Sequence, residues 1–208
     1  MARKIKQSPK LPAETRRQQL LDSAFKLFVK KGYRATTAEE IARNAGLTKG
    51  ALYFHFKSKE EVLYQLVKAI WARQKRAFEE ALPTPFTPRE FLGTLLSLHT
   101  QEGKLPEYWD VVDLWVQAMR IPRMKRYLAR QTEGILAEFV NAVTPAYDAG
   151  RKRTTQLAIL MLSICDGLSF FQAMNSRLVD LKEQKKMIET LLDNQGPVKV
   201  RKRGRSAQ

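Results

Sequence analysis

The chain has 208 residues, of which 44% are hydrophobic and 28% are charged, and its formal net charge at pH 7 is +16. The apolar content is ample for the core of one or two globular domains, and a single cysteine, Cys165, excludes an intrachain disulfide. Because no apolar stretch follows the basic first residues, and the most apolar run, residues 157–165, is too short to span a bilayer, we expect a cytoplasmic protein without a membrane partner.

The first predicted helix opens at Pro12 and Glu14 and ends at Gly32. Apolar residues recur along one face of it: Leu20, Leu21, Ala24, Phe25 and Phe28. Residues 1–60 carry 14 Lys and Arg against 5 Asp and Glu, whereas residues 61–195 carry 18 against 16. The basic excess therefore lies on the N-terminal region and on the last residues of the chain, which is typical of a surface that meets nucleic-acid phosphate.

Residues 37–56 predict two short helices joined by a sharp turn. Thr37 and Glu40 have the spacing of a capping box, so the first helix should begin at about Ala38, and Thr48 should cap the second. A small residue, a glycine and a leucine follow at the positions where the helices meet, turn and pack: Ala42, Gly46 and Leu52. This order is typical of a helix-turn-helix. The motif also occurs in helical proteins that do not bind DNA, but the basic charge around it favours DNA binding.

Three stretches carry a family resemblance: AFKLFVKKGY at 24–33, TAEEIARNAGLTKGALYFHF at 37–56 and KSKEEVL at 57–63. On these residues the chain resembles, from Ala13 to about Trp71, the DNA-binding domain of the TetR family of bacterial transcription regulators. The resemblance implies a homodimer that represses or, less often, activates transcription. It also implies that a small molecule entering the C-terminal domain releases the operator.

Eight residues are predicted to bind DNA, partly from the resemblance and partly from helix geometry: Thr37, Thr48, Lys49, Gly50, Tyr53, His55, Lys57 and Lys59. By resemblance, Thr37 and Thr48 lie where helix starts meet phosphate, and Lys59 lies against the DNA backbone. Leu52 and Phe56 recur at i and i+4 and should face inward, which turns the other side of the recognition helix outward. The cations beside the predicted Ser58 cap suit a phosphate at a helix start.

Six further helices are predicted after the motif. The first of them runs from Lys59 toward Leu82, and at roughly 1.5 Å per residue it is long enough to connect two domains. The expected ranges of the others are 87–102, 106–119, 122–143, 151–176 and 180–193. We therefore predict an all-α fold of about nine helices. It comprises a basic arm at 1–12, a helix-turn-helix DNA-binding domain at 13–71, a helical ligand-binding and dimerisation domain at 72–195, and a basic disordered tail at 196–208.

Any small-molecule effector should bind in the domain at 72–195. A pocket there would be lined by aromatic and neighbouring side chains: Phe91, His99, Trp109, Trp115 and Met119. Residues of these types are more often ordinary core residues than pocket residues, so both interpretations stay open for each of them. We predict no metal site and no other cofactor.

The predicted helix at 151–176 is apolar on two sides. One side can meet the core of its own subunit, and the other is most economically covered by the same helix of a second subunit, although a fully buried helix in a monomer remains an alternative. The predicted dimer interface comprises Leu160, Ile164, Gly167, Leu168, Phe171, Ile188 and Leu192. A dimer would place two recognition helices on a palindrome with half-sites roughly 34 Å, or a multiple of it, apart.

The sequence therefore predicts a sequence-specific, ligand-responsive repressor that acts as a homodimer on double-stranded DNA. A sequence-tolerant DNA binder, or a regulator controlled by a protein partner, is the alternative, and the ratio of specific to nonspecific affinity would identify the former. An enzyme is not expected, because the chain has no Ser nucleophile elbow, no Gly-rich phosphate loop and no Cys/His cluster. We assign no catalytic residue.

Overall fold

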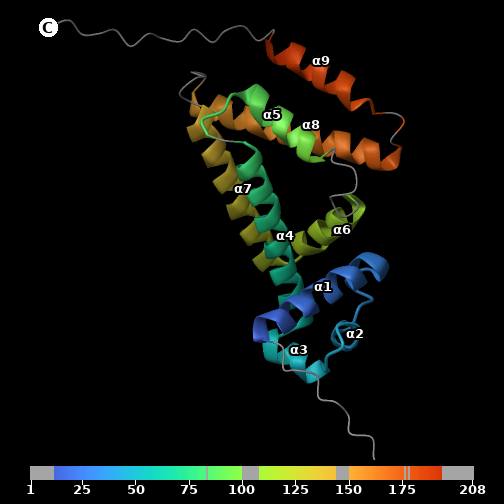
Figure 1. Ribbon diagram of the computed structural model, residues 1–208. Helices are drawn as coiled ribbons and strands as arrows, with labels where there is room; N and C mark the ends of the chain where they lie inside the picture. The colour runs from blue at the N-terminus through green and yellow to red at the C-terminus, as the bar shows by residue number, and fades with distance from the viewer. Residues whose placement is uncertain are drawn as a thin grey trace, which may run out of the picture. The chain divides into compact units, whose positions relative to one another are not determined.

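The computed structural model describes residues 12–82, 84–99, 108–143, 150–175, 177 and 179–193. Within these ranges the chain forms nine α-helices and no strand, which confirms the predicted all-α class (Figure 1). The helices are α1 (Ala13–Lys31), α2 (Ala38–Asn44), α3 (Lys49–His55), α4 (Lys59–Ala81), α5 (Pro88–His99), α6 (Tyr108–Met119), α7 (Pro122–Val143), α8 (Arg151–Met174) and α9 (Leu181–Asp193). Apart from Pro12, the basic arm at 1–12 and the tail at 196–208 lie outside the described residues, so the statements about them stay predictions.

The helix ends follow residues that the sequence marks as caps and stops. Thr87 begins α5 with a complete capping box, in which the Glu90 N–H donates to Thr87 Oγ1 at 3.2 Å and the Thr87 N–H donates to Glu90 Oε2 at 2.7 Å. At the end of α1, Gly32 has a φ of 84°, and its N–H donates to the Phe28 carbonyl at 2.8 Å. A positive φ is accessible to glycine at little cost, which explains why α1 ends there.

The chain divides into two compact units. The first comprises Met1–Ile70 and Asp113–Ala118, and the second comprises Trp71–Val112 and Met119–Gln208. The division after Ile70 lies beside the boundary predicted after residue 71. The sequence had placed residues 113–118 in the second domain, whereas the structure groups them with the first. Helix α4 contributes Lys59–Ile70 to the first unit and its remaining residues to the second.

The first unit packs α1 against α2 and α3. Its largest fully buried side chains come from α1, α2, α3, α4, the residue after α3 and the α6 residues of this unit: Leu20, Phe28, Ile41, Leu52, Phe56, Leu63 and Leu114. Burying a side chain of this kind stabilises a fold by roughly 1.5–3 kcal/mol. Helices α2 and α3 have seven residues each, too few for a stable isolated helix, so this packing must hold them in place.

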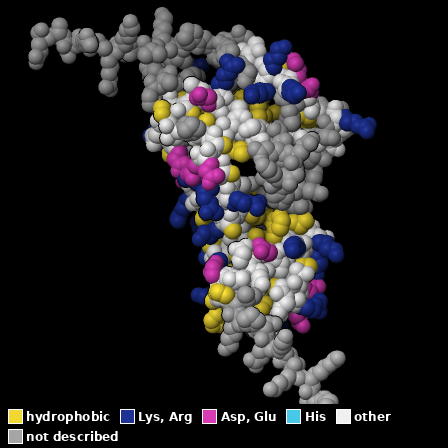
Figure 2. All heavy atoms as spheres, in the orientation of Figure 1, with side chains coloured by type: hydrophobic (Ala, Val, Ile, Leu, Met, Phe, Trp, Pro, Cys, Tyr) yellow, Lys and Arg dark blue, Asp and Glu magenta, His cyan; other side chains and the backbone are white. Residues whose placement is uncertain are grey.

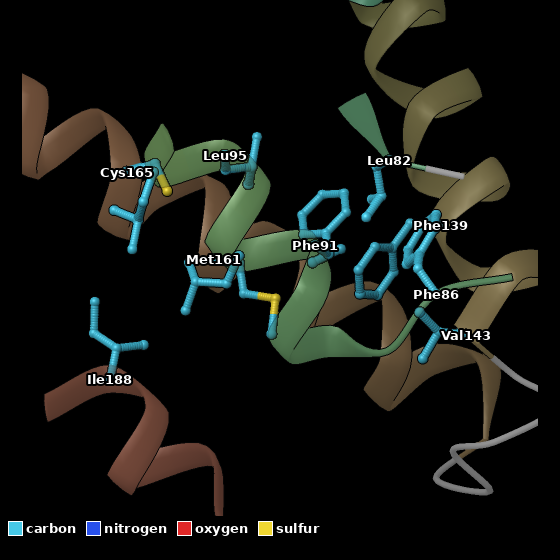
Figure 3. Packing of buried hydrophobic residues seen from close by; sticks show 12 residues of the cluster. Leu82, Phe86, Phe91, Leu95, Phe139, Val143, Met161, Cys165 and Ile188 are labelled. Carbon is cyan, nitrogen blue, oxygen red and sulfur yellow. The ribbon is translucent and has the colours of Figure 1, made fainter. Parts of the chain in front are cut away.

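The core of the second unit joins the end of α4 to α5, α7, α8 and α9 (Figure 3). Phe91 makes three ring contacts in it, with centroid distances of 4.5 Å to Phe139, 5.1 Å to Phe78 and 5.6 Å to Phe86. The first two contacts are edge-to-face, the arrangement that aromatic quadrupoles favour. The other buried members are Leu82, Leu92, Leu95, Leu96, Val143, Ala158, Met161, Cys165 and Ile188.

The cysteine of this core has an unreactive thiol. Cys165 lies on α8, is buried and forms no disulfide. Burial, together with the nearby charge of Asp166, raises the pKa of its thiol to about 12. The thiol is therefore protonated at neutral pH and packs as a small apolar side chain.

Candidate nucleic-acid interface

The first helix of the motif begins with the predicted capping box. The Glu40 N–H donates to Thr37 Oγ1 at 3.2 Å, and the Thr37 N–H donates to Glu40 Oε2 at 2.8 Å. The Thr37 hydroxyl also donates to the same carboxylate at 2.9 Å. Thr37 is exposed, so this cap lies at the surface. The capping box fixes the start of α2 with interactions that need no other element.

The turn between α2 and α3 has the three features that the sequence predicted. Ala42 is buried, with 1% of its surface exposed, and its carbonyl accepts from the Leu47 N–H at 2.9 Å. Gly46 has a φ of 69°, which an L-residue rarely adopts. Leu52 is completely buried and packs where the two helices meet. The helix-turn-helix is therefore present as predicted at residues 37–56.

Helix α3 presents one face to the core and another to the outside. Thr48 caps it by accepting from the Ala51 N–H at 3.2 Å. Leu52 points inward, whereas Lys49, Gly50 and Tyr53 are exposed, as helix geometry predicted. The exposed face thus offers a cation, a backbone without a side chain and a phenol, which can meet a phosphate or a base edge in a groove.

Two aromatic residues at the end of α3 differ from the sequence interpretation. His55, predicted to bind DNA, is half-buried, and its ring lies 5.1 Å from that of Phe54 and 6.4 Å from that of Phe56. Phe54 is 81% exposed and was not predicted as a site residue. Its exposure could have been predicted from helical periodicity, because Phe54 lies off the face that Leu52 and Phe56 define. So large an exposed ring on the recognition helix can contact a thymine methyl group.

Lys57 and Lys59 were both predicted to bind DNA, but their surroundings differ. Lys57 is exposed. Lys59 is half-buried, and its Nζ donates to the carbonyls of Thr36 at 2.8 Å, Tyr33 at 2.9 Å and Arg34 at 3.3 Å. An ammonium group has three N–H donors, so none is left for a phosphate in this arrangement. The structure thus gives Lys59 partners inside its own chain in place of the predicted DNA backbone.

The charges beside the motif compensate one another. Lys31 Nζ lies 2.6 Å from Glu40 Oε1, and the hydrogen bonds from Lys31 and then from Thr37 lower the pKa of Glu40 to about 2. Burial lowers the pKa of Lys59 below its ordinary value, Glu40 opposes this shift and Lys31 adds to it. On the face shown in Figure 2, Lys and Arg side chains lie over both units, interspersed with Asp and Glu. Arg43 on α2, Lys49 on α3 and Lys57 after it are exposed cations beside this ion pair.

Two polar residues of α1, Ser23 and Arg17, contact the motif and α4. Ser23 is buried on α1, donates to the Ile41 carbonyl at 2.7 Å and accepts from Asn44 Nδ2 at 2.9 Å. Arg17 lies over the Phe56 ring, with 5.5 Å between its guanidinium carbon and the ring centroid, and donates to Gln65 Oε1 of α4 at 3.0 Å. These contacts position α2 and the end of α3 on a common support.

Comparison with known proteins agrees with this geometry. Residues 20–66, which extend from α1 into α4 and include the whole motif, match the sequence model described as "Bacterial regulatory proteins, tetR family". Over these residues the chain is similar to the TetR family. The resemblance noted from the sequence is thereby confirmed, and the candidate interface lies within the matched residues.

Curated relatives match different lengths of the chain. YerO of Bacillus subtilis, an uncharacterized HTH-type transcriptional regulator, is 27% identical over 188 residues, 86% of this chain and 64% of YerO. The HTH-type transcriptional repressor KstR2 of Mycobacterium tuberculosis H37Rv is 46% identical over 118 residues, 54% of this chain and 56% of KstR2. The chain therefore spans less than two thirds of the length of either relative.

A solved structure shares the fold. A TetR-like transcriptional regulator from Rhodococcus sp. RHA1 superposes with a TM-score of 0.65 at 21% sequence identity. The match covers 88% of this chain and 96% of the other. It extends the fold similarity beyond the DNA-binding residues to the helices of the second unit.

The five residues predicted to line an effector pocket do not form one described site. Phe91 is 2% exposed inside the core of the second unit, so for this residue the alternative of core packing is right. Trp115 is half-buried in the first unit, and Met119 is 55% exposed in the second. The side chains of His99 and Trp109 lie outside the described residues. A hollow of about 460 Å³ at the start of α8 is lined by other residues: Gly150, Arg151, Lys152, Arg153 and Gln156.

The residues predicted for the dimer interface divide between a free face and the core. Leu160 and Phe171 are 56% and 55% exposed. Three others contact the core of their own unit: Ile188 is buried in it, and Ile164 and Leu168 are partly buried against it, so their place in a dimer interface stays a prediction. Gly167 is half-buried, and the side chain of Leu192 lies outside the described residues. Helical spacing indicated that α8 is apolar on two sides, but it could not distinguish which residues face the core of the same chain.

Helix α8 exposes an apolar face that the sequence identified only in part. Besides Leu160 and Phe171, this face includes Ile159 (39% exposed), Phe170 (39%) and Met174 (62%). Arg151–Gln172 is long and apolar enough to cross a membrane by length and composition, contrary to the expectation from the uninterrupted run at 157–165, and 28% of its most apolar window is buried. A core helix of a soluble protein meets the same criterion, so the helix by itself does not indicate a membrane.

Proposed function

We propose that this chain is a cytoplasmic transcriptional repressor that binds a palindromic operator as a homodimer and releases it when a small molecule binds. The observation that carries the proposal is the exposed face of α3. Lys49, Gly50 and Tyr53 are exposed there, while Leu52 and Phe56 fix the helix from behind with no more than 1% of their surface exposed. A rigidly held helix with a cation and a phenol outward is suited to groove binding.

The first experiment selects bound sequences from random duplex DNA with the purified protein at physiological salt. A palindromic consensus supports a dimeric, sequence-specific regulator. Tight binding without a consensus would favour the sequence-tolerant alternative, and no binding at all would refute DNA recognition by α3. A reporter gene placed behind the recovered operator then distinguishes repression from activation.

Two variants test whether α3 reads the operator. Lys49→Ala and Tyr53→Phe remove polar atoms from exposed side chains, so helicity should be unchanged. If either group contacts a base edge, its loss costs about 1–3 kcal/mol, or on the order of 5- to 150-fold in operator affinity. Lys125→Ala removes one positive charge from an exposed position on α7 and is the matched control. Equal effects of Lys49→Ala and the control would mean that only net charge matters.

The dimer part of the proposal rests on the exposed face of α8. We propose a second copy of this chain as its partner, because Leu160, Phe170, Phe171 and Met174 leave large apolar side chains 39–62% exposed on one helix. Met187 on α9 is also 53% exposed. Exposed apolar patches of this kind mark interfaces. A two-fold axis through α8 would pair two α3 helices for a palindrome.

Sedimentation equilibrium tests the dimer. The double variant Leu160→Asp with Phe171→Asp should sediment as a monomer with native helicity, while Thr132→Asp, at an exposed position on α7, should leave the dimer intact. If the double variant remains a dimer, the interface lies elsewhere. If the unmodified protein is a monomer, the palindrome part of the proposal fails as well.

The effector part of the proposal is supported by the similarity to the TetR family rather than by a described pocket. Its test is fluorescence anisotropy of an operator duplex bound to the protein, titrated with a broad small-molecule library, with thermal shift as a second measurement. A compound that releases DNA should also raise the unfolding temperature of the free protein, since a ligand stabilises the state that it binds. If no compound changes operator binding, control by a protein partner becomes the favoured alternative.

A further inference from the structure

We propose that Lys59 is a positioning residue: its ammonium group closes the turn between α1 and α2, and so holds the cap of α2 and the start of α4 in a fixed relation. In this role Lys59 does not bind a DNA phosphate. The inference about the turn rests on the described contacts alone, and its consequence for operator affinity rests on the proposed function.

The first step is the geometry around the ammonium. Lys59 Nζ donates to the carbonyls of Thr36 at 2.8 Å, Tyr33 at 2.9 Å and Arg34 at 3.3 Å. The same nitrogen lies 4.4 Å from the centroid of the Tyr33 ring, a cation–π distance. Tyr33 is itself held by an edge-to-face contact with the buried Phe28, at 5.2 Å. Lys59 thus occupies a site built from backbone oxygens and a supported ring.

The second step is the position of these carbonyls in the chain. They belong to the connection between α1 and α2, outside the helices, and the Tyr33 carbonyl also accepts from the Thr36 N–H at 3.3 Å. Backbone carbonyls that are partly removed from water need a donor, and Lys59 supplies it. Thr36, completely buried, adds a second closure, because its hydroxyl donates to the Gly32 carbonyl at 2.9 Å. The next residue is Thr37, the cap of α2.

The third step is charge. Glu40 forms its short contact with Lys31, at 2.6 Å, and its other oxygen accepts from Thr37. The direct contacts of the Lys59 ammonium are therefore with carbonyl oxygens and the Tyr33 ring, and the charge of Glu40 also favours its ionised form. To reach a phosphate it would have to give up these three charge-assisted hydrogen bonds, which opposes the exchange.

The consequence is a mechanical connection within the first unit. Lys59 is the first residue of α4, so the contact of its ammonium group with the turn carbonyls, here called the Lys59 clamp, joins the start of α4 directly to the residue before the α2 cap. The Arg17 contacts with Gln65 and the Phe56 ring form a second tie, between α4 and the end of α3. A displacement of the start of α4 is therefore transmitted to both helices of the motif.

The test compares Lys59→Met with Lys57→Met, which removes the same charge two residues away. Operator affinity is measured against salt concentration at a temperature where both variants are fully folded. Losing a phosphate contact reduces the slope of log K against log[salt] by about 0.9. We expect this reduction for Lys57→Met. For Lys59→Met we expect weaker binding at every salt concentration with an unchanged slope.

A second comparison uses Lys59→Arg. A phosphate contact would be rescued by arginine, which binds phosphate at least as well as lysine does. The planar guanidinium cannot direct three N–H groups at three carbonyls around one point, so we expect no rescue of affinity. In the absence of DNA, both Lys59 variants should lower the unfolding midpoint by roughly 5 °C or more, whereas Lys57→Met should not.

A measurement on the unmodified protein keeps the proposal testable if the variants fail to fold. In lysine-ammonium NMR, the Lys59 N–H protons should exchange slowly with water, and their signal should be unchanged when operator is added. Lys57 should exchange fast. The proposal that Lys59 holds the turn would be refuted by a reduced salt slope of operator binding for Lys59→Met, by recovery of operator affinity in Lys59→Arg, or by fast exchange of the Lys59 ammonium protons with water. If the protein binds no DNA, the proposed function fails, while the exchange and unfolding measurements still decide the clamp.

Discussion

Replacing Thr48 by aspartate separates the structural role of the α3 cap from its predicted contact with DNA. Thr48 Oγ1 accepts one hydrogen bond, from the Ala51 N–H at 3.2 Å, and no carboxylate faces it from the third helical position. Aspartate is at least as good a cap as threonine, and its charge suits the positive end of the helix dipole. Thr48→Asp should therefore be as stable as the unmodified protein, whereas Thr48→Ala should lose about 1 kcal/mol.

The expected effect of Thr48→Asp on DNA binding is the opposite. If Thr48 lies beside a phosphate, the new carboxylate is placed at about 4 Å from a like charge, which costs about 1–4 kcal/mol for an effective dielectric constant between that of water and that of a protein surface. Operator affinity should then fall by about fivefold or more, and the loss should shrink as salt is added.

Two measurements on the same preparations check this prediction. Urea unfolding ranks the three proteins by stability, and fluorescence anisotropy with an operator duplex at two salt concentrations ranks them by affinity. The expected pattern is that Thr48→Ala is less stable and binds moderately, while Thr48→Asp is stable and binds poorly. If Thr48→Asp binds the operator as tightly as the unmodified protein at low salt, the start of α3 does not face a phosphate.

Three further predictions concern the fold. Gly46→Ala should destabilise the fold by about 1–2 kcal/mol in urea unfolding, because Gly46 has a φ of 69°; the backbone alone causes this loss, since an added Cβ meets nothing within 4 Å. Gly93→Ala on α5 also has free space for a Cβ but no positive φ, so it should stabilise the fold by about 0.5–1 kcal/mol in the same assay. Phe91→Ala should lower the free energy of unfolding by about 3–5 kcal/mol, measured by calorimetry, and a much smaller loss would favour the interpretation of Phe91 as a pocket residue. The pKa of Glu40 is about 2 in the fold against an ordinary 4.5, so its ionised form stabilises α2 fully above pH 4.5 and this contribution is lost as pH falls toward 2; carboxyl NMR titration measures the pKa, and Glu40→Gln should remove this part of the acid dependence.

The parts of the site that the sequence predicted well are those set by neighbouring residues. A hydroxyl three positions before a Glu or Ala N–H is enough to cap a helix, so Thr37 and Thr48 could be recognised as caps without any tertiary knowledge. Gly46 lies in a turn whose geometry is also local. The exposed face of α3 followed from helical periodicity as soon as Leu52 was placed inward.

The parts that the sequence did not predict depend on residues far apart in the chain. Lys59 contacts carbonyls 23–26 positions earlier, and nothing in its own neighbourhood distinguishes it from the exposed Lys57. Phe91 and Ile188 are apolar residues on amphipathic helices, and periodicity shows that they face something apolar without showing what. The structure identifies that neighbour as the core of the second unit, through ring contacts such as the one between Phe91 and Phe139 at 4.5 Å.

The small reading surface of α3 itself argues for the proposed dimer. The helix has seven residues, and the exposed residues that suit polar recognition are Lys49, Gly50 and Tyr53, with Phe54 adding an apolar contact. Each good base contact discriminates by about 1–3 kcal/mol, so one such face supplies too little to find one site among the many in a genome. Two faces at a fixed separation add their contributions and also require correct half-site spacing. The exposed apolar face of α8 offers a means of fixing that separation, and loss of the dimer in Leu160→Asp with Phe171→Asp should therefore reduce specificity more than it reduces nonspecific binding.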